Sequence, residues 1–105
     1  MDRAGRIRSL LGIAQRAHRI VSGRTAVEQA MTDGTAKLLI IAGDAEESSA
    51  REYEDMARRC NVPCHTVLTR EQLGSCLGKE YRAAAAVLDD GFKVSLEKLL
   101  GDAGT

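Results

Sequence analysis

Lys37-Leu38-Leu39-Ile40-Ile41-Ala42 decides the fold of this chain, because it is an unbroken apolar run between turn-forming residues. Gly34 precedes the run and Gly43 follows it directly. A short apolar run bounded in this way is typical of a strand whose two faces are both buried. We therefore predict a central strand over residues 37–42, which requires helices on both faces of its sheet.

The N-terminal segment of the chain has apolar residues at the spacing of a helix. Apolar residues recur at intervals of three and four positions and form one face, made of Ile7, Leu10, Leu11 and Ala14. This spacing predicts a helix over about residues 3–17. Residues 18–22 are rich in β-prone side chains and predict a short strand at an edge of the sheet.

A second helix is expected between this edge strand and the central strand, over about residues 25–33. Thr25 and Glu28 have the spacing of a capping box, in which each side chain bonds the backbone of the other residue. Gly34 supplies the stop signal, since glycine readily takes the left-handed conformation that ends a helix.

The chain after the central strand predicts two more helices around one strand. Acidic residues after Gly43 favour a helix start, and the inward stripe of this helix would be Tyr53, Met56, Ala57 and Cys60. Pro63 interrupts the pattern, and residues 64–68 predict a strand. Thr69 and Gln72 again have capping-box spacing, so a short helix is expected up to about Gly78.

Residues 83–88 are ambiguous, because four alanines favour a helix while the position after a helix and a loop favours a strand. We interpret them as a strand. Asp89-Asp90-Gly91 then predicts a turn and a helix cap, followed by a last helix that buries Phe92, Leu96, Leu99 and Leu100. Residues 101–105 are expected to form a frayed tail.

Helices alternate with strands along the whole chain. This order predicts the α/β class, as a three-layer α/β/α sandwich with a small mixed sheet covered by helices on both faces. A length of 105 residues suits one small core, so a single domain is expected over residues 1–100.

The charges are unevenly distributed although their total is zero. Residues 1–24 hold six arginines and one aspartate, and therefore carry a net charge of +5 against −5 for the rest. Arginine also outnumbers lysine by 11 to 4, and its planar fork suits bidentate contacts with phosphate or guanine. This favours a local anion-binding face, although a solvated arginine-rich helix would give the same pattern.

Composition argues against several classes of protein. An aromatic content of 3% disfavours a platform of stacked bases, and no apolar run approaches the length of about 20 residues that a membrane helix needs. The run after the first arginines is too short for the core of a signal peptide. Three cysteines without paired spacing indicate reduced thiols, so we expect a cytoplasmic protein without a membrane partner.

Metal binding and catalysis have little support in the sequence. Cys60, Cys64 and His65 have suitable ligand atoms, but adjacent residues of a strand point to opposite faces. Neither histidine has an obvious nucleophile or orienting carboxylate, and Gly74-x-x-x-Gly78 lacks the Lys-Ser/Thr that completes a phosphate loop. We expect no enzyme activity, no metal, no cofactor and no small-molecule substrate.

Several short pieces, in this order, resemble the kink-turn-binding ribosomal-protein superfamily of the L-seven-Ae and L-thirty-e type, most of all its bacterial YlxQ-like branch. The resemblance extends from about Ile7 to Leu100. The pieces that carry it are Leu10-Leu11-Gly12-Ile13-Ala14-Gln15-Arg16-Ala17, Val21-Ser22-Gly23, Ala36-Lys37-Leu38-Leu39-Ile40-Ile41-Ala42-Gly43-Asp44-Ala45, Asn61-Val62-Pro63, Glu71-Gln72-Leu73-Gly74 and Gly78-Lys79.

The resemblance implies that RNA is contacted by the start of the second helix, where family members carry a Gly-x-Asn-Glu motif. Here Gly23 keeps the glycine and Arg24 takes the variable position. Thr25 stands where asparagine is usual, and Ala26 stands where glutamate is usual. Because Ala26 has no polar group, this corner is better suited to hold phosphates than to read base edges.

The resemblance also implies a second RNA contact, from the loop that follows Leu73-Gly74. This loop presents Lys79 and Arg82 as cations and Tyr81 as a ring on which a base can stack. Lys37 corresponds to a position that family members often place near phosphates. Without the resemblance, these loop charges would equally suit a solvated surface.

The function expected from the sequence is therefore RNA binding by a ribosomal-protein-like, translation-associated protein. Its target would be a structured RNA, of which a kinked RNA is one candidate, and a monomer is expected. The alternative is a protein-interaction module on the same fold, acting through the Thr25-Ala26 corner or the acidic segment 46–54. A shared basic face for Arg16, Arg19, Arg24, Lys79 and Arg82 would favour RNA.

Overall fold

A computed structural model of the chain describes residues 2–101, which form five helices and four strands in alternation. The helices are α1 (Arg3–Arg16), α2 (Arg24–Asp33), α3 (Glu47–Arg59), α4 (Arg70–Cys76) and α5 (Asp90–Gly101). The strands are β1 (Ile20–Ser22), β2 (Leu38–Ile41), β3 (Cys64–Thr66) and β4 (Ala84–Val87).

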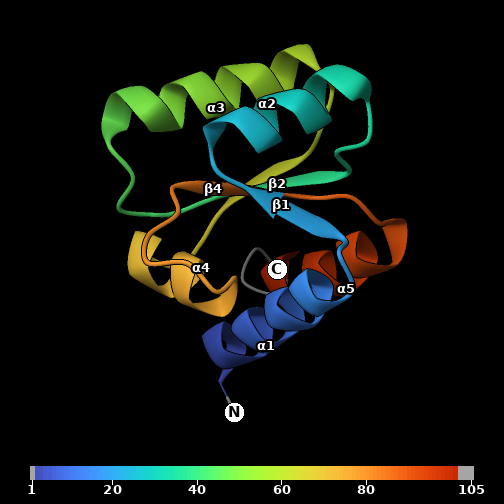
Figure 1. Cartoon of the computed structure of the whole chain (residues 1–105), viewed down its shortest axis with the longest axis vertical. Helices are drawn as coiled ribbons and strands as arrows, with labels where there is room; N and C mark the ends of the chain where they lie inside the picture. Colours follow the sequence, from blue (N-terminus) through green and yellow to red (C-terminus); the bar gives the residue numbers. More distant parts are fainter. Residues whose placement is uncertain (1, 102–105) are drawn as a thin grey trace.

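The four strands form one mixed sheet in the order β1-β4-β2-β3. β4 is antiparallel to both of its neighbours, and β2 is parallel to β3. Figure 1 shows α2 and α3 on one face of this sheet and α1, α4 and α5 on the other. The three-layer α/β/α sandwich predicted from the sequence is therefore confirmed, with β2 inside the sheet and β1 at its edge.

Alternation along the two inner strands divides the apolar residues between two cores. Leu38 and Ile40 of β2 face the α1, α4 and α5 layer, and Leu39 and Ile41 face the α2 and α3 layer. In β4 the alanines of 84–86 are almost fully buried. Their small side chains let helices pack closely on both faces, which resolves the ambiguity of this segment in favour of a strand.

Two expectations about helix ends are wrong. α2 begins at Arg24 with Gly23 as its N-cap, so Thr25 lies inside the helix and forms no capping box with Glu28. α3 begins only at Glu47 and ends at Arg59, which leaves Cys60 exposed after the helix rather than on its inward stripe. The start of α2 was misplaced because Gly23 and Thr25 are both acceptable caps, and the end of α3 was misplaced because a sequence pattern locates a helix end only to within one or two residues.

Other helix signals are confirmed. Thr69 and Gln72 form both hydrogen bonds of a capping box at the start of α4. Gly34 ends α2 in the left-handed conformation, with a φ of 75°.

The C-terminal end differs from its prediction. Gly101, where the predicted tail began, is the last residue of α5, and residues 102–105 lie outside the described part of the chain. No helix within residues 2–101 has the length and apolar character needed to cross a membrane.

Candidate nucleic-acid interface

The turn from β1 into α2 depends on Gly23. Its φ of 89° and ψ of 157° are unfavourable for any residue with a Cβ, and its N–H donates weakly to the Ala84 carbonyl at 3.4 Å. No side chain caps the helix that follows. The first N–H groups of α2 therefore carry the partial positive charge of a helix start without a protein acceptor from a capping side chain.

Arg82 is brought to this turn from the other end of the sequence. Its Nε donates to Ser22 Oγ at 2.9 Å and lies 3.8 Å from the position that a Cβ on Gly23 would occupy. Its Nη1 donates to the Tyr81 carbonyl at 3.2 Å. We call Ser22, Gly23 and Arg82 the Gly23–Arg82 corner, in which a guanidinium group is fixed beside an uncapped helix start.

The segment 78–82, which we call the 78–82 loop, is held against α4 by its backbone. The Lys79 N–H donates to the Gly74 carbonyl at 2.8 Å, and the Arg82 N–H donates to the Arg70 carbonyl at 3.0 Å. Gly74 permits this contact, because a Cβ there would lie 2.7 Å from the Glu80 carbonyl oxygen. The anchored loop leaves Lys79 exposed and the Tyr81 side chain 61% exposed.

Arg24 does not join this corner, although it follows Gly23 directly. Its Nε contacts Glu28 Oε1 at 2.5 Å, its Nη2 forms an ion pair with Glu52 of α3, and its Cζ lies 5.4 Å from the centre of the Tyr53 ring. The hydrogen bonds that Arg24 donates to Glu52 and then to Glu28 raise the pKa of Arg24 above its ordinary value. The side chain is thus directed onto α3 and its charge is already balanced by two carboxylates.

Lys37 lies at the other end of the sheet from Gly23. The Lys37 N–H donates to the carbonyl of Val87, whereas Gly23 bonds Ala84, three residues earlier in β4. Three residues of a strand span about 10 Å. Arg19 lies at the Lys37 end as well, since its carbonyl accepts from the N–H of Leu88. The structure therefore does not bring Lys37 together with the Gly23–Arg82 corner.

The five basic residues whose shared face would favour RNA do not share one, because the structure separates them into four places. The distribution of these charges therefore does not support RNA binding. Arg82 and Lys79 belong to the corner and its loop, while Arg24 lies against α3 and Arg19 lies near Val87. Arg16 lines a hollow beside α4. This division was hidden in the sequence, because it depends on Ser22 and Glu52, whose partners lie 60 and 28 residues away.

The remaining side chains at the start of α2 offer few base contacts. Thr25 is exposed and Ala26 is half-buried, and neither side chain caps the helix. Gln29, one turn further, donates to Asp33 Oδ1 at 2.9 Å. The corner can thus present backbone N–H groups, one hydroxyl and one guanidinium, which is a set of donors suited to anionic oxygen.

The cysteines and histidines do not form a metal site among the described residues, where no three potential ligands gather closely enough. Cys60 is exposed, and Cys64 and Cys76 are half-buried. Burial, and then the charge of Glu54, raise the pKa of the Cys64 thiol. A raised pKa favours the neutral thiol, which is a poor metal ligand.

Comparisons of the sequence with known proteins match most of the chain. The model of the Ribosomal protein L7Ae/L30e/S12e/Gadd45 family matches residues 5–97. RNA-binding protein YlxQ of Bacillus subtilis (strain 168) is 38% identical over 91 residues, which cover 87% of this chain and 91% of that protein. RNA-binding protein YlxQ of Enterococcus faecium is 25% identical over 92 residues, which cover 88% of each chain.

Solved structures share the fold. A protein of unknown function from Bacillus halodurans C superposes with a TM-score of 0.84 at 32% identity, covering 90% of this chain and 95% of that one. The Giardia lamblia 15.5kD RNA binding protein gives a TM-score of 0.79 at 17% identity, covering 99% of this chain and 89% of its own. The second likeness shows the shared fold alone.

Proposed function

This chain belongs to the Ribosomal protein L7Ae/L30e/S12e/Gadd45 family, and on that premise we propose that it is a non-enzymatic protein that binds structured RNA. The proposed contacts are the Gly23–Arg82 corner, with Thr25 and Ala26 beside it, and the exposed Lys79 and Tyr81 of the 78–82 loop. Two relatives named as RNA-binding proteins support RNA as the ligand.

The observation that carries the proposal is the position of the Arg82 guanidinium beside the uncapped start of α2. The hydrogen bond to Ser22 fixes Nε, which leaves other N–H groups of the fork for a phosphate oxygen. Backbone N–H groups at a helix start attract the same oxygen. A guanidinium group and backbone N–H groups from distant parts of the chain can thus bind the same phosphate oxygen.

The 78–82 loop adds contacts of a different kind. Lys79 supplies an exposed cation, and Tyr81 supplies a ring that a base displaced from its stack can cover. Because hydrogen bonds and the close contact at Gly74 anchor the loop, its backbone needs little ordering when RNA binds. We leave Arg24 and Lys37 out of the proposed RNA contacts, because Arg24 is paired with Glu28 and Glu52 and Lys37 lies at the other end of the sheet.

The proposed mode of recognition relies on RNA shape more than on base edges. Phosphate contacts set the position and orientation of a nucleic acid, whereas specificity for a base needs donors and acceptors at its edge. Thr25 supplies only a hydroxyl, and Ala26 supplies no polar group. An RNA whose backbone is already bent, such as a kinked RNA, is the target we propose to test first.

Association with the ribosome or with translation, in the cytoplasm and as a monomer, forms part of the proposal. Its support is the ribosomal-protein family to which the chain belongs. Crosslinking to RNA in cells and sequencing of the bound fragments would identify the target. Recovery of ribosomal RNA fragments is the expected result.

The direct test measures binding of the whole chain to a fluorescein-labelled RNA hairpin with a kink of tandem G·A pairs, and to a straight duplex of equal length. Fluorescence anisotropy at several salt concentrations gives the affinity and its salt dependence. We expect the double variant Lys79→Ala, Arg82→Ala to lose about tenfold or more in affinity, with a salt slope lower by about 1.5, because two phosphate contacts are removed.

The matched control is Arg51→Ala, Arg58→Ala, which removes two exposed cations of α3 that are paired with neighbouring carboxylates. This control should bind as the unaltered chain does. Circular dichroism shows whether each variant is folded, and Arg82→Gln keeps a donor to Ser22 if Arg82→Ala unfolds. Equal binding by the corner variant and the control, or absence of RNA binding by the unaltered chain, would contradict the proposal.

A further inference from the structure

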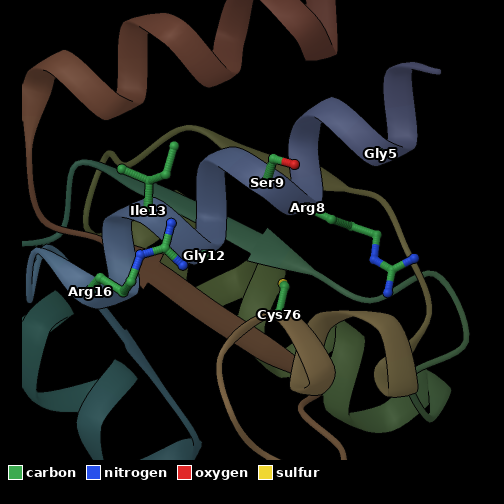
Figure 2. A pocket seen from close by; sticks show the side chains of 7 residues that line it. All are labelled: Gly5, Arg8, Ser9, Gly12, Ile13, Arg16 and Cys76. Carbon is green, nitrogen blue, oxygen red and sulfur yellow. The ribbon is translucent and has the colours of Figure 1, made fainter. Parts of the chain in front are cut away.

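A hollow of about 600 Å³ lies between α1 and α4, away from the Gly23–Arg82 corner. Figure 2 shows Arg8 and Arg16 of α1 at its two ends, with Gly12 between them and Cys76 of α4 on the facing side. We call this hollow the α1–α4 groove. No acidic residue lines it among the described residues, so its charge comes from arginine alone.

Helical spacing aligns the two arginines. Arg8, Gly12 and Arg16 are four residues apart and therefore lie on one face of α1. Eight residues of helix separate the two arginines by about 12 Å along the axis. Gly12 has no side chain, and the Arg16 guanidinium lies over it, with Nη1 3.7 Å from the position that a Cβ on Gly12 would occupy.

The arginines of the described residues differ in whether a carboxylate balances their charge. Arg24, Arg51, Arg58 and Arg70 each form an ion pair with a carboxylate. Arg8 and Arg16 form no ion pair with any of residues 2–101. Other arginines, namely Arg3, Arg6, Arg19, Arg59 and Arg82, also form no ion pair within residues 2–101, so what sets Arg8 and Arg16 apart is that both line the groove.

The groove lies close to the 78–82 loop along the chain. Cys76, in the groove, is the last residue of α4, and Lys79 follows only three residues later. Three residues span at most about 10 Å. The Lys79 N–H also bonds back to Gly74, which keeps the start of the loop beside the end of α4. One extended ligand can therefore contact both places.

We propose that the α1–α4 groove binds the sugar–phosphate backbone of the same RNA that contacts the corner, with Arg8 and Arg16 each holding a phosphate. This inference rests on the proposed function and adds a second contact region to it. The guanidinium fork binds phosphate in a bidentate manner, and two such forks on one face of a helix suit two phosphates of one backbone.

The test uses the labelled kinked hairpin and the straight duplex described above. The groove variant is Arg8→Ala, Arg16→Ala, and its matched control is Arg3→Ala, Arg6→Ala, which removes two arginines from the same helix but outside the groove. We expect the groove variant to lose about tenfold in affinity and about 1.5 in salt slope relative to that control. Arg8→Lys, Arg16→Lys keeps both charges and both aliphatic stems, and should recover most of the slope.

The outcomes separate this inference from the proposed function. If the unaltered chain binds no RNA, the proposed function fails and the groove proposal fails with it. If the corner variant loses affinity while the groove variant matches its control, only the groove proposal is overturned. If the groove variant leaves RNA binding unchanged but no longer binds a labelled polyglutamate peptide that the unaltered chain binds, the groove proposal is overturned and the groove is assigned to an acidic protein segment.

Discussion

Gly23 and Arg24 are neighbours, yet their roles diverge. Gly23 is the N-cap of α2 and leaves the helix start without a capping side chain, whereas the Arg24 side chain forms ion pairs with Glu28 and Glu52. The family resemblance placed both residues in one RNA contact. Two carboxylates of α2 and α3 hold the Arg24 guanidinium, so the RNA contact that we propose uses Gly23 and Arg82 and leaves Arg24 out.

Releasing Arg24 should strengthen RNA binding. In the double variant Glu28→Gln, Glu52→Gln both ion pairs lose their negative charge, so the guanidinium can reach a phosphate beside Gly23. We expect a tighter complex and a salt slope steeper by about one phosphate contact, measured with the kinked hairpin.

The control for this prediction is the pair Glu47→Gln, Asp55→Asn, which removes two acidic groups of α3 that bind Arg51 and Arg58. An equal gain in affinity from this control would mean that overall charge, and not Arg24, determines the change.

At the scale of elements, α4 depends on its capping box more than longer helices depend on theirs. It has seven residues, and short helices are marginal without such end contacts. Thr69 accepts from the Gln72 N–H at 3.1 Å, and the Gln72 side chain accepts from the Thr69 N–H at 3.0 Å. Because α4 carries the 78–82 loop, its stability also determines the geometry of the proposed RNA contact.

Two threonines with the same sequence signature should therefore respond differently to substitution. Thr69→Ala should lower the free energy of unfolding by about 1 kcal/mol, since it removes a formed cap. Thr25→Ala should change it by less than about 0.5 kcal/mol, because Thr25 lies inside α2 and forms no cap. Urea titrations of the two variants and the unaltered chain measure both values, and equal losses would contradict the assignment of the caps.

Elements were predictable where the signal is local. The apolar run predicts β2 and the helical spacing predicts α1, and each pattern lies entirely within the element that it predicts. The start of α2 was mispredicted because Gly23 and Thr25 are both acceptable caps, and only the turn from β1 selects between them. The Gly23–Arg82 corner was predictable only as two separate loops, since its central hydrogen bond joins residues 60 positions apart.

At the scale of the whole molecule, packing on both faces of the sheet makes stability sensitive to alkaline pH. Burial raises the pKa values of the Cys64 and Cys76 thiols, the latter opposed by the charge of Arg8. The unfolded chain then releases these protons at a lower pH than the folded chain does. Stability is therefore complete below the ordinary thiol pKa of about 8.5 and declines as the pH rises above it.

Urea midpoints measured from about pH 7 to pH 9.5 test this decline, below the range where Tyr53, whose pKa is also raised by burial, begins to contribute. The double variant Cys64→Ala, Cys76→Ala should show a smaller decline than the unaltered chain. The control Cys60→Ala removes a thiol that folding leaves exposed. An unchanged decline in the double variant would exclude the buried thiols as its source.

The two edges of the sheet have a consequence for solubility. β1 and β3 are its outer strands, and each has only three residues. Gly23 ends β1 in a conformation that a continuing strand does not adopt, and Pro63 comes directly before β3 with no N–H to offer. Short, interrupted edges give a second chain few backbone groups to pair with. Concentrated solutions of the protein should thus resist growth into β-rich aggregates, even though the interior of the sheet is almost wholly aliphatic.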